Sequence, residues 1–188
     1  MLTDNELINR CLLKDPRAQE LLYRRFAPKM YGVCLRYAGN EGEAEDILQE
    51  GFIRIFNNLQ HYRFEGALAG WVHRTMINTA INHYHKNLKF RKESELNENL
   101  LVATIHQDAL SFLSRDELLQ VIRTLPIGYR TIFNLYAIEG YTHREIGAML
   151  GISENTSKSQ LSRARNAIRE ILTKQMKIEQ NGRVSSNR

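Results

Sequence analysis

The residues best suited to bind a ligand through hydrogen bonds lie between positions 154 and 170, where the pattern predicts a helix. Apolar and small residues recur at helical spacing and define one buried side: Ser157, Leu161, Ala164, Ile168 and Leu172. The opposite face carries six donors and no carboxylate: Asn155, Lys158, Ser159, Ser162, Arg163 and Asn166. Short and basic side chains let a helix enter a major groove and bond to bases and phosphates. The alternative is an ordinary helical hairpin with a solvated polar face.

A second set of polar residues follows position 44, on a predicted helix from about Glu43 to Leu59. With Leu48 turned inward, the outward positions are Asp46, Glu50, Ile53 and Asn57, with Gln49 at the edge. An apolar Ile53 among polar neighbours suits a protein interface. The alternative is that it is a single exposed isoleucine, which is common on protein surfaces.

A third set combines aromatic, amide and basic residues between positions 60 and 92. A predicted loop from Gln60 to Gly70 contains Phe64 and Gly66, and the helix after it carries Trp71, Arg74, Asn78 and Asn82. Unstacked nucleic-acid bases need aromatic or amide partners and close backbone approach, which this segment offers. The alternative for Trp71 is a core aromatic. A basic cluster follows that is suited to a DNA backbone: Lys86, Lys89, Arg91 and Lys92.

The predicted helix that carries the six donors is preceded by a helix-turn-helix pattern. Thr142 and Glu145 have the spacing of a capping box at the start of a short helix. Gly151 supplies the turn because it tolerates a positive φ, and Ser153 caps the next helix. Arg165 and Arg169 flank the polar face and are placed for backbone contacts.

The remaining sequence is also helical in pattern, so the expected fold class is all-α, with two small helical bundles joined by a flexible linker. We expect a first domain over residues 1–90, a linker over 91–113 and a second domain over 114–175 that contains the helix-turn-helix. Residues 176–188 are expected to form a disordered tail.

The positive charge of the chain is concentrated near its C-terminus. The net charge is +5, and residues 142–188 alone contain nine basic and four acidic residues. The excess therefore lies in the last quarter of the chain, beside the helix-turn-helix, where it favours a polyanionic partner. A solvated basic tail is the alternative.

Other function classes have little support in the sequence. His83 and His85 point apart on a helix, and no Gly-rich phosphate loop or Cys/His ligand set accompanies them. We therefore expect no enzyme, metal or cofactor. Cys11 and Cys34 lie in apolar helical patterns and are expected to be buried thiols. No stretch has the pattern of a membrane span or a secretory signal, which predicts a cytoplasmic protein.

Two motif sets, in order along the chain, resemble the extracytoplasmic-function (ECF) group of bacterial RNA polymerase sigma factors. The segment from Leu125 to Arg165 resembles region 4, including Glu139-Gly140-Tyr141-Thr142 and Leu150-Gly151-Ile152-Ser153. The resemblance implies that this region reads the promoter −35 element. The implied contacts are Arg130, Thr142, Asn155, Lys158, Ser159, Ser162, Arg163 and Arg165.

The N-terminal half resembles region 2 of the same group. The segment Glu45–Arg54 is similar to the helix that docks on the polymerase clamp helices, which implies that Asp46, Gln49, Glu50 and Ile53 bind polymerase. The segment from Phe64 to Asn82 is similar to the −10-reading part, with Asn78 at the position that lines the pocket for a flipped base. The implied −10 residues are Phe64, Gly66, Trp71, Arg74, Asn78, Asn82 and Lys86.

The resemblance implies core RNA polymerase (its clamp helices and flap) and promoter DNA as partners, a possible anti-sigma factor, and a monomer when free. The competing hypothesis is a stand-alone helix-turn-helix regulator that binds an operator as a dimer without polymerase. The surface from Asp46 to Ile53 distinguishes the two hypotheses, because a simple regulator has no use for it.

Overall fold

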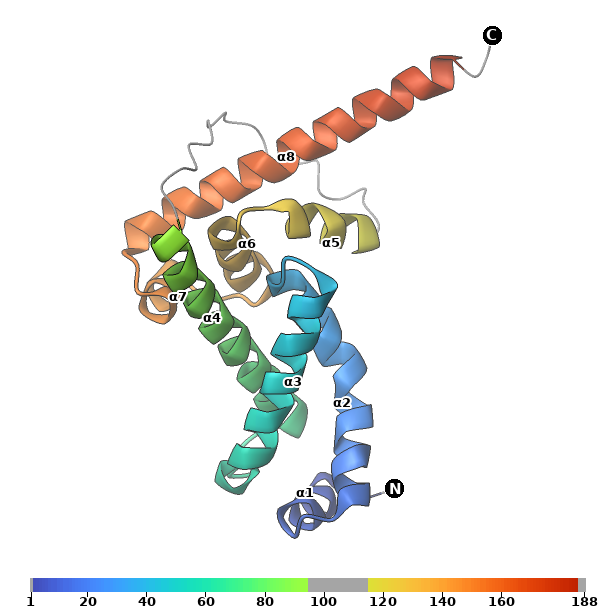
Figure 1. Cartoon of the computed structure of the whole chain (residues 1–188), viewed down its shortest axis with the longest axis vertical. Coiled ribbons are helices and arrows are strands. Elements are labelled where there is room, and N and C mark those ends of the chain that lie inside the picture. The colour runs from blue at the N-terminus through green and yellow to red at the C-terminus, as the bar shows by residue number, and fades with distance from the viewer. Residues whose placement is uncertain (1, 95–114, 186–188) are drawn as a thin grey trace. The chain divides into compact units, whose positions relative to one another are not determined.

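The computed structural model describes residues 2–94 and 115–185, and side chains for 2–88 and 118–174. In these residues every regular element is helical, and the chain divides into two compact units, residues 1–87 and 88–188 (Figure 1). The N-terminal unit contains α1 (Asp4–Leu12), α2 (Pro16–Tyr37), α3 (Glu41–Asn58), the short 3-10 helix η1 (Leu59–His61) and most of α4 (Leu68–Ser94). The C-terminal unit contains α5 (Arg115–Thr124), α6 (Ile127–Phe133), the π-helical η3 (Asn134–Ile138), α7 (His143–Leu150) and α8 (Glu154–Ser185).

Side-chain caps set where the helices of the N-terminal unit begin. Thr3 and Glu6 form the predicted capping box at the start of α1, and Asp15 caps α2 with Pro16 in its first turn. Asn40 accepts a hydrogen bond from the backbone N–H of Glu43 and so caps α3. These caps satisfy N–H groups that have no partner inside their own helix.

Apolar side chains spaced at helical intervals form the core of the N-terminal unit. Helices α2 and α3 lie side by side (Figure 1), and fully buried residues include Leu22, Met30, Ile47 and Ile55. Gly51 on α3 allows α4 to approach closely, since a Cβ there would collide with Sδ of Met76. This close approach brings the polar edges of α3 and α4 together.

The C-terminal unit is built on α8, against which α5, α6 and α7 pack. The capping box of Thr142 and Glu145 starts α7, and Gly151 ends it in the left-handed conformation, at φ +68°. The turn then passes directly over α7, because a Cβ on Gly147 would lie 2.8 Å from the carbonyl oxygen of Ile152. The helix-turn-helix therefore has the order and caps that the sequence predicts.

Two element ends differ from the expected boundaries. Helix α4 continues to Ser94, past the expected domain end at residue 90, and α8 continues to Ser185, through most of the expected disordered tail. Lys174, Gln175 and Met176 have high helix propensity, which agrees with the continuation of α8 past the expected end. Most of the expected linker, 91–113, lies outside the described residues.

The described residues form no helix that is both long and apolar enough to cross a membrane.

Candidate functional site

The polar face of α8 is exposed over its first three turns, as the spacing predicts. Ser157 and the four apolar positions after it are buried, whereas the opposite side is open: Asn155, Lys158, Ser159, Ser162 and Arg163 are exposed, and Arg165 is half-buried. An exposed face of this composition is free to contact a duplex.

Two of these exposed side chains already have partners within α8. The ammonium group of Lys158 lies 2.7 Å from a carboxylate oxygen of Glu154, and Ser159 donates a hydrogen bond to the carbonyl of Thr156 at 3.0 Å. The hydrogen bond and charge of Lys158 lower the pKa of Glu154 below its ordinary value. A DNA phosphate would therefore compete with Glu154 for Lys158, whereas no such ion pair involves Arg163 in the described part of the chain.

Asn166 does not belong to the polar face, contrary to the sequence prediction. Its side chain is only 6% exposed, and its Oδ1 lies 3.5 Å from Nη1 of Arg169. The prediction used a single buried stripe along α8, but three helices pack against α8 and widen its covered side. We therefore remove Asn166 from the DNA-facing set.

Arg130 occupies an interior position in the structure, although the resemblance implies a phosphate contact there. It is 4% exposed, and its Nη1 donates a hydrogen bond to the carbonyl of Arg123 at 2.9 Å. This bond ties α6 to the end of α5, which gives Arg130 a role in holding the unit together. The predicted Thr142, in contrast, is exposed at the start of α7, where its hydroxyl donates to Glu145 at 2.7 Å.

A residue that the sequence prediction missed, His143, connects α7 to the donor-bearing helix. Its Nδ1 lies 3.0 Å from Oγ of Ser157, and its ring stacks on Tyr136 with centroids 4.4 Å apart. The guanidinium of Arg165 lies 5.7 Å from the centroid of the same tyrosine ring. The capping pattern predicts a helix start at His143 but carries no signal for these contacts, which depend on tertiary packing.

In the N-terminal unit, the predicted protein-binding positions lie on the open side of α3. Asp46 and Gln49 are exposed, and Ile53 is 55% exposed although it is apolar. Glu50 is half-buried at the edge of this surface. The structure therefore agrees with the outward positions that the helical spacing predicts.

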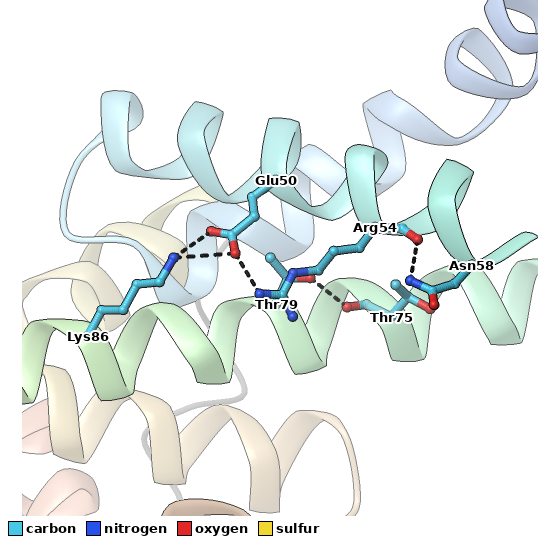
Figure 2. Close-up of polar contacts among 6 residues, drawn as sticks. All are labelled: Glu50, Arg54, Asn58, Thr75, Thr79 and Lys86. Carbon is cyan, nitrogen blue, oxygen red and sulfur yellow. Dashed lines mark hydrogen bonds and ion pairs between the residues drawn. The ribbon is translucent and has the colours of Figure 1, made fainter.

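Glu50 is held by two cations, as Figure 2 shows. Arg54 lies 2.6 Å from its Oε1, and Lys86, from α4, lies 3.2 Å from its Oε2. Burial raises the pKa of Glu50, but the hydrogen bonds and charges of Arg54 and Lys86 outweigh it and leave the pKa below its ordinary value. The carboxylate is therefore ionised and oriented, and the polar strip continues along α3 and α4 (Figure 2) through Asn58, Thr75 and Thr79.

The loop before α4 is closed by an aromatic cluster. The hydroxyl of Tyr62 donates a hydrogen bond to the carbonyl of Gly66 at 2.7 Å, and the Tyr62 ring lies 5.0 Å from Phe64 and 5.5 Å from Trp71. Phe64 is 48% exposed and has a φ of +59°, which costs a residue other than glycine about 1 kcal/mol or more. The loop is thus held in a conformation that presents an aromatic side chain to solvent.

The predicted −10 residues on α4 lie on one face of the helix. Trp71, Arg74, Asn78 and Asn82 follow at i+3, i+7 and i+11, so they form a single stripe. Arg74 and Asn78 are exposed, and Trp71 and Asn82 are half-buried. Trp71 contacts the Tyr62 ring and keeps part of its own surface exposed. Its position is therefore intermediate between the two alternatives that the sequence leaves open, a buried core aromatic and an exposed ring that stacks on bases.

The described residues hold no group of three or more histidine, cysteine or acidic side chains that is placed to bind a metal ion. Cys11 and Cys34 are both buried free thiols, and burial raises the pKa of Cys34 to about 12. The side chains that the two surfaces expose include cations, amides, hydroxyls and aromatic rings.

Comparison with known families identifies both units. The family profile described as "Sigma-70 region 2" matches residues 22–89, and the profile described as "Sigma-70, region 4" matches residues 115–168. The first match contains the α3 surface and the α4 stripe, and the second contains the helix-turn-helix. The two matches come in the order that the sequence motifs predict.

Individual relatives agree with these matches. The chain is 32% identical over 157 residues to the ECF RNA polymerase sigma factor SigE of Mycolicibacterium smegmatis, covering 81% of this chain and 61% of that protein. It is 29% identical to the RNA polymerase sigma-H factor of Pseudomonas aeruginosa, covering 90% and 93% of the two chains.

A solved structure of similar fold is the sigma factor RpoE from Bartonella quintana, in complex with the anti-sigma factor NepR. It has a TM-score of 0.50 and 18% sequence identity, and the match covers 82% of this chain and 96% of that one. At this identity the likeness concerns the fold.

Proposed function

The chain belongs to the ECF group of sigma-70 factors, and we propose that it binds core RNA polymerase and directs initiation at promoters that it reads at −35 and −10. The observation that carries this proposal is that one chain combines the exposed donor face of α8 with an exposed α3 surface and a strained aromatic loop before α4. A stand-alone regulator needs only the first of these. Sigma factors are initiation factors rather than enzymes, which agrees with two surfaces built for binding.

In the C-terminal unit, α8 enters the major groove of the −35 element. Ser162 and Arg163 bond to base edges, since both are exposed and the described structure gives neither a competing hydrogen bond or ion pair. Lys158 and Thr142 contact phosphates, with Lys158 leaving Glu154 to do so. Asn155, Ser159 and Arg165 extend this surface on either side. Arg130 acts indirectly, by holding α6 against α5.

In the N-terminal unit, the α3 surface of Asp46, Gln49, Glu50 and Ile53 docks on the clamp helices of polymerase. The exposed Ile53 supplies apolar contact area, and the acidic groups around it set the orientation. The flap of polymerase is the second contact that the family resemblance implies.

The loop and the α4 stripe of the same unit bind the opened −10 strand. Phe64 and Trp71 offer ring faces for bases, Asn78 and Asn82 offer amides, and Arg74 and Lys86 offer charge to the backbone. Gly66, at φ +91° and with nothing within 4 Å of the position that a Cβ would take, allows a nucleotide to approach the loop backbone. Base capture there would favour the melted form of the −10 region.

We further propose that the protein works in the cytoplasm, where polymerase and DNA are, and that it is a monomer when free. We also propose an anti-sigma factor as a partner, since the RpoE factor of Bartonella quintana was solved in complex with the anti-sigma factor NepR. Such a partner would act by covering the same exposed surfaces.

The decisive experiment is transcription from purified core polymerase with and without this chain, on promoters selected by the reconstituted holoenzyme from a randomised pool. We expect specific transcripts only when the chain is present, and co-elution of the chain with core on gel filtration. The absence of both specific transcripts and core binding would overturn the proposal. DNA binding without core binding would favour the stand-alone regulator.

A further inference from the structure

His143 is placed between the two elements that must be aligned for DNA reading. It is the first residue of α7, it stacks on Tyr136 of η3 at an interplanar angle of 20°, and its Nδ1 reaches Ser157 of α8 at 3.0 Å. Ser157 is fully buried, and Lys158 and Ser159 of the donor face follow it directly. The imidazole therefore bridges η3, α7 and α8 at the point where the reading face begins.

These contacts restrain the rotation of α8 about its own axis, together with the buried side of α8. A stacked ring pair restrains the side chain of His143, and the bond to Ser157 restrains one direction on α8. The rotation of a recognition helix decides which side chains meet the bases. His143 is thus a positioning residue for the exposed donors.

The charges around His143 are mostly positive. Lys158 and Arg165 approach it from α8, Arg144 is its neighbour on α7, and Tyr136 is the titratable group on η3. Glu154 is the acidic group that acts on it, and this carboxylate is paired with Lys158. Burial first, and then Lys158 and Arg165, lower the pKa of His143, so the ring is neutral in the free protein at pH 7.5.

We propose that His143 positions the recognition helix and that it takes up a proton when the −35 duplex binds. The inference rests on the proposed function, because it requires phosphates beside Thr142 and Lys158. Negative charge at that place favours the imidazolium, both directly and by neutralising Lys158.

The sign of the pH dependence follows from linkage. Because DNA raises the pKa of His143, the complex holds more protons than the free protein between the two pKa values. Affinity for the −35 duplex therefore rises as the pH falls through that interval and becomes constant below it. A rise of one unit in the pKa corresponds to about a tenfold gain in affinity.

The positions of the histidines in the sequence allow a pH dependence of −35 binding to be assigned to His143. His143 is the only histidine after residue 115; the other five, at positions 61, 73, 83, 85 and 106, come before α5 in the sequence. The test measures fluorescence anisotropy of the full chain with a labelled duplex that the protein has itself selected from a randomised pool, from pH 5.5 to 8.

We expect the wild type to bind about tenfold more tightly at the low end of this range. H143Q should lose the pH dependence, and its affinity at pH 8 should lie between those of the wild type and H143A, since the glutamine oxygen can accept a bond from Ser157 but the ring stack on Tyr136 is lost. H143A should bind more weakly at every pH. His85→Gln, in the N-terminal unit, is the matched control and should leave the wild-type profile unchanged. An H143Q profile that keeps the wild-type slope would overturn the inference.

A second experiment uses the wild type alone, so its outcome does not require any variant to fold. NMR titration of the imidazole of His143, with and without the duplex, should show a higher pKa in the complex, and an equal or lower value would overturn proton uptake. Failure of the wild type to bind any selected duplex at any pH would instead count against the proposed function itself.

Discussion

Lys86 on α4 reaches across to Glu50 on α3, with its Nζ 3.2 and 3.4 Å from the two carboxylate oxygens (Figure 2). The sequence assigns these two residues to different partners, Glu50 to polymerase and Lys86 to DNA. The structure joins them in one ion pair, with Arg54 on the other side of the carboxylate. The two binding surfaces of the N-terminal unit therefore share a charged residue pair.

The Glu50–Lys86 pair should contribute modestly to stability, in a pH-dependent way. Because the folded protein lowers the pKa of Glu50, its contribution is present above the ordinary value of 4.5 and is lost as the pH falls through the folded value. In a double-mutant cycle of E50Q and K86Q, we expect a coupling of about 0.5 kcal/mol at pH 7 in urea unfolding, as for partly exposed pairs. The coupling should fall toward zero as the pH falls through the folded pKa of Glu50. A cycle on the more exposed Glu20–Arg24 pair is the control and should give less.

The exposed Ile53 should matter for polymerase binding and not for folding. Ile53→Ser removes apolar area from the α3 surface, so we expect core affinity to fall about tenfold, which corresponds to about 1.4 kcal/mol. The melting temperature should change little, because more than half of the side chain is already exposed. Leu13→Ser, at an apolar residue that is 83% exposed at the end of α1, is the control. Equal losses for the two variants would argue against a specific α3 interface.

Most of the fold could be predicted from the sequence because its signals are local. Capping boxes at Thr3 and Thr142, proline after Asp15, and glycine at 151 each act on their own helix end, and the structure has all four. The helix ends after residue 90 and beyond 176 were predicted less well. Helix α8 passes through Asn181-Gly182, a pair that typically ends a helix, so the structure departs there from the local signal.

The site could be predicted as a set of faces but not as a set of contacts. Helical spacing alone gives the open sides of α3 and α8, because neighbours along one helix determine them. The burial of Arg130 and Asn166, the Glu50–Lys86 pair and the His143–Ser157 bond each depend on a second helix. Nothing in the spacing of one helix reports what packs against it.

The Tyr62 hydroxyl should be needed for promoter opening. Tyr62→Phe keeps the ring contacts to Phe64 and Trp71 but removes the bond to the Gly66 carbonyl, which should cost about 1 kcal/mol of stability. The strained loop would then relax, so we expect slower open-complex formation, measured with 2-aminopurine in the −10 strand, at unchanged −35 affinity. Tyr23→Phe on α2 is the matched control. Unchanged opening by Tyr62→Phe would remove this loop from the melting step.

Gly147 should tolerate no side chain. In Gly147→Ala the new Cβ would lie 2.8 Å from the Ile152 carbonyl oxygen, which is backbone and cannot swing aside. We expect a loss of about 1–3 kcal/mol, as for other overpacked positions, and a lower melting temperature of the C-terminal unit. Gly70→Ala is the control, since nothing lies within 4 Å of its Cβ position and alanine favours helix. A neutral Gly147→Ala would mean that the turn can move away from α7.

Arg163 and Lys158 should separate sequence reading from phosphate binding. Arg163→Ala should weaken binding to the selected −35 duplex by about 1–3 kcal/mol and relax specificity at one base pair, with little effect on random DNA. Lys158→Ala should weaken both duplexes equally and reduce the salt slope by about 1. Its loss should also be the smaller, because Glu154 already competes for Lys158 at 2.7 Å in the free protein. Anisotropy over a salt series measures both quantities. If Arg163→Ala lowered affinity for selected and random duplexes alike, Arg163 would be a phosphate contact, and base reading would fall to Ser162 and Asn155.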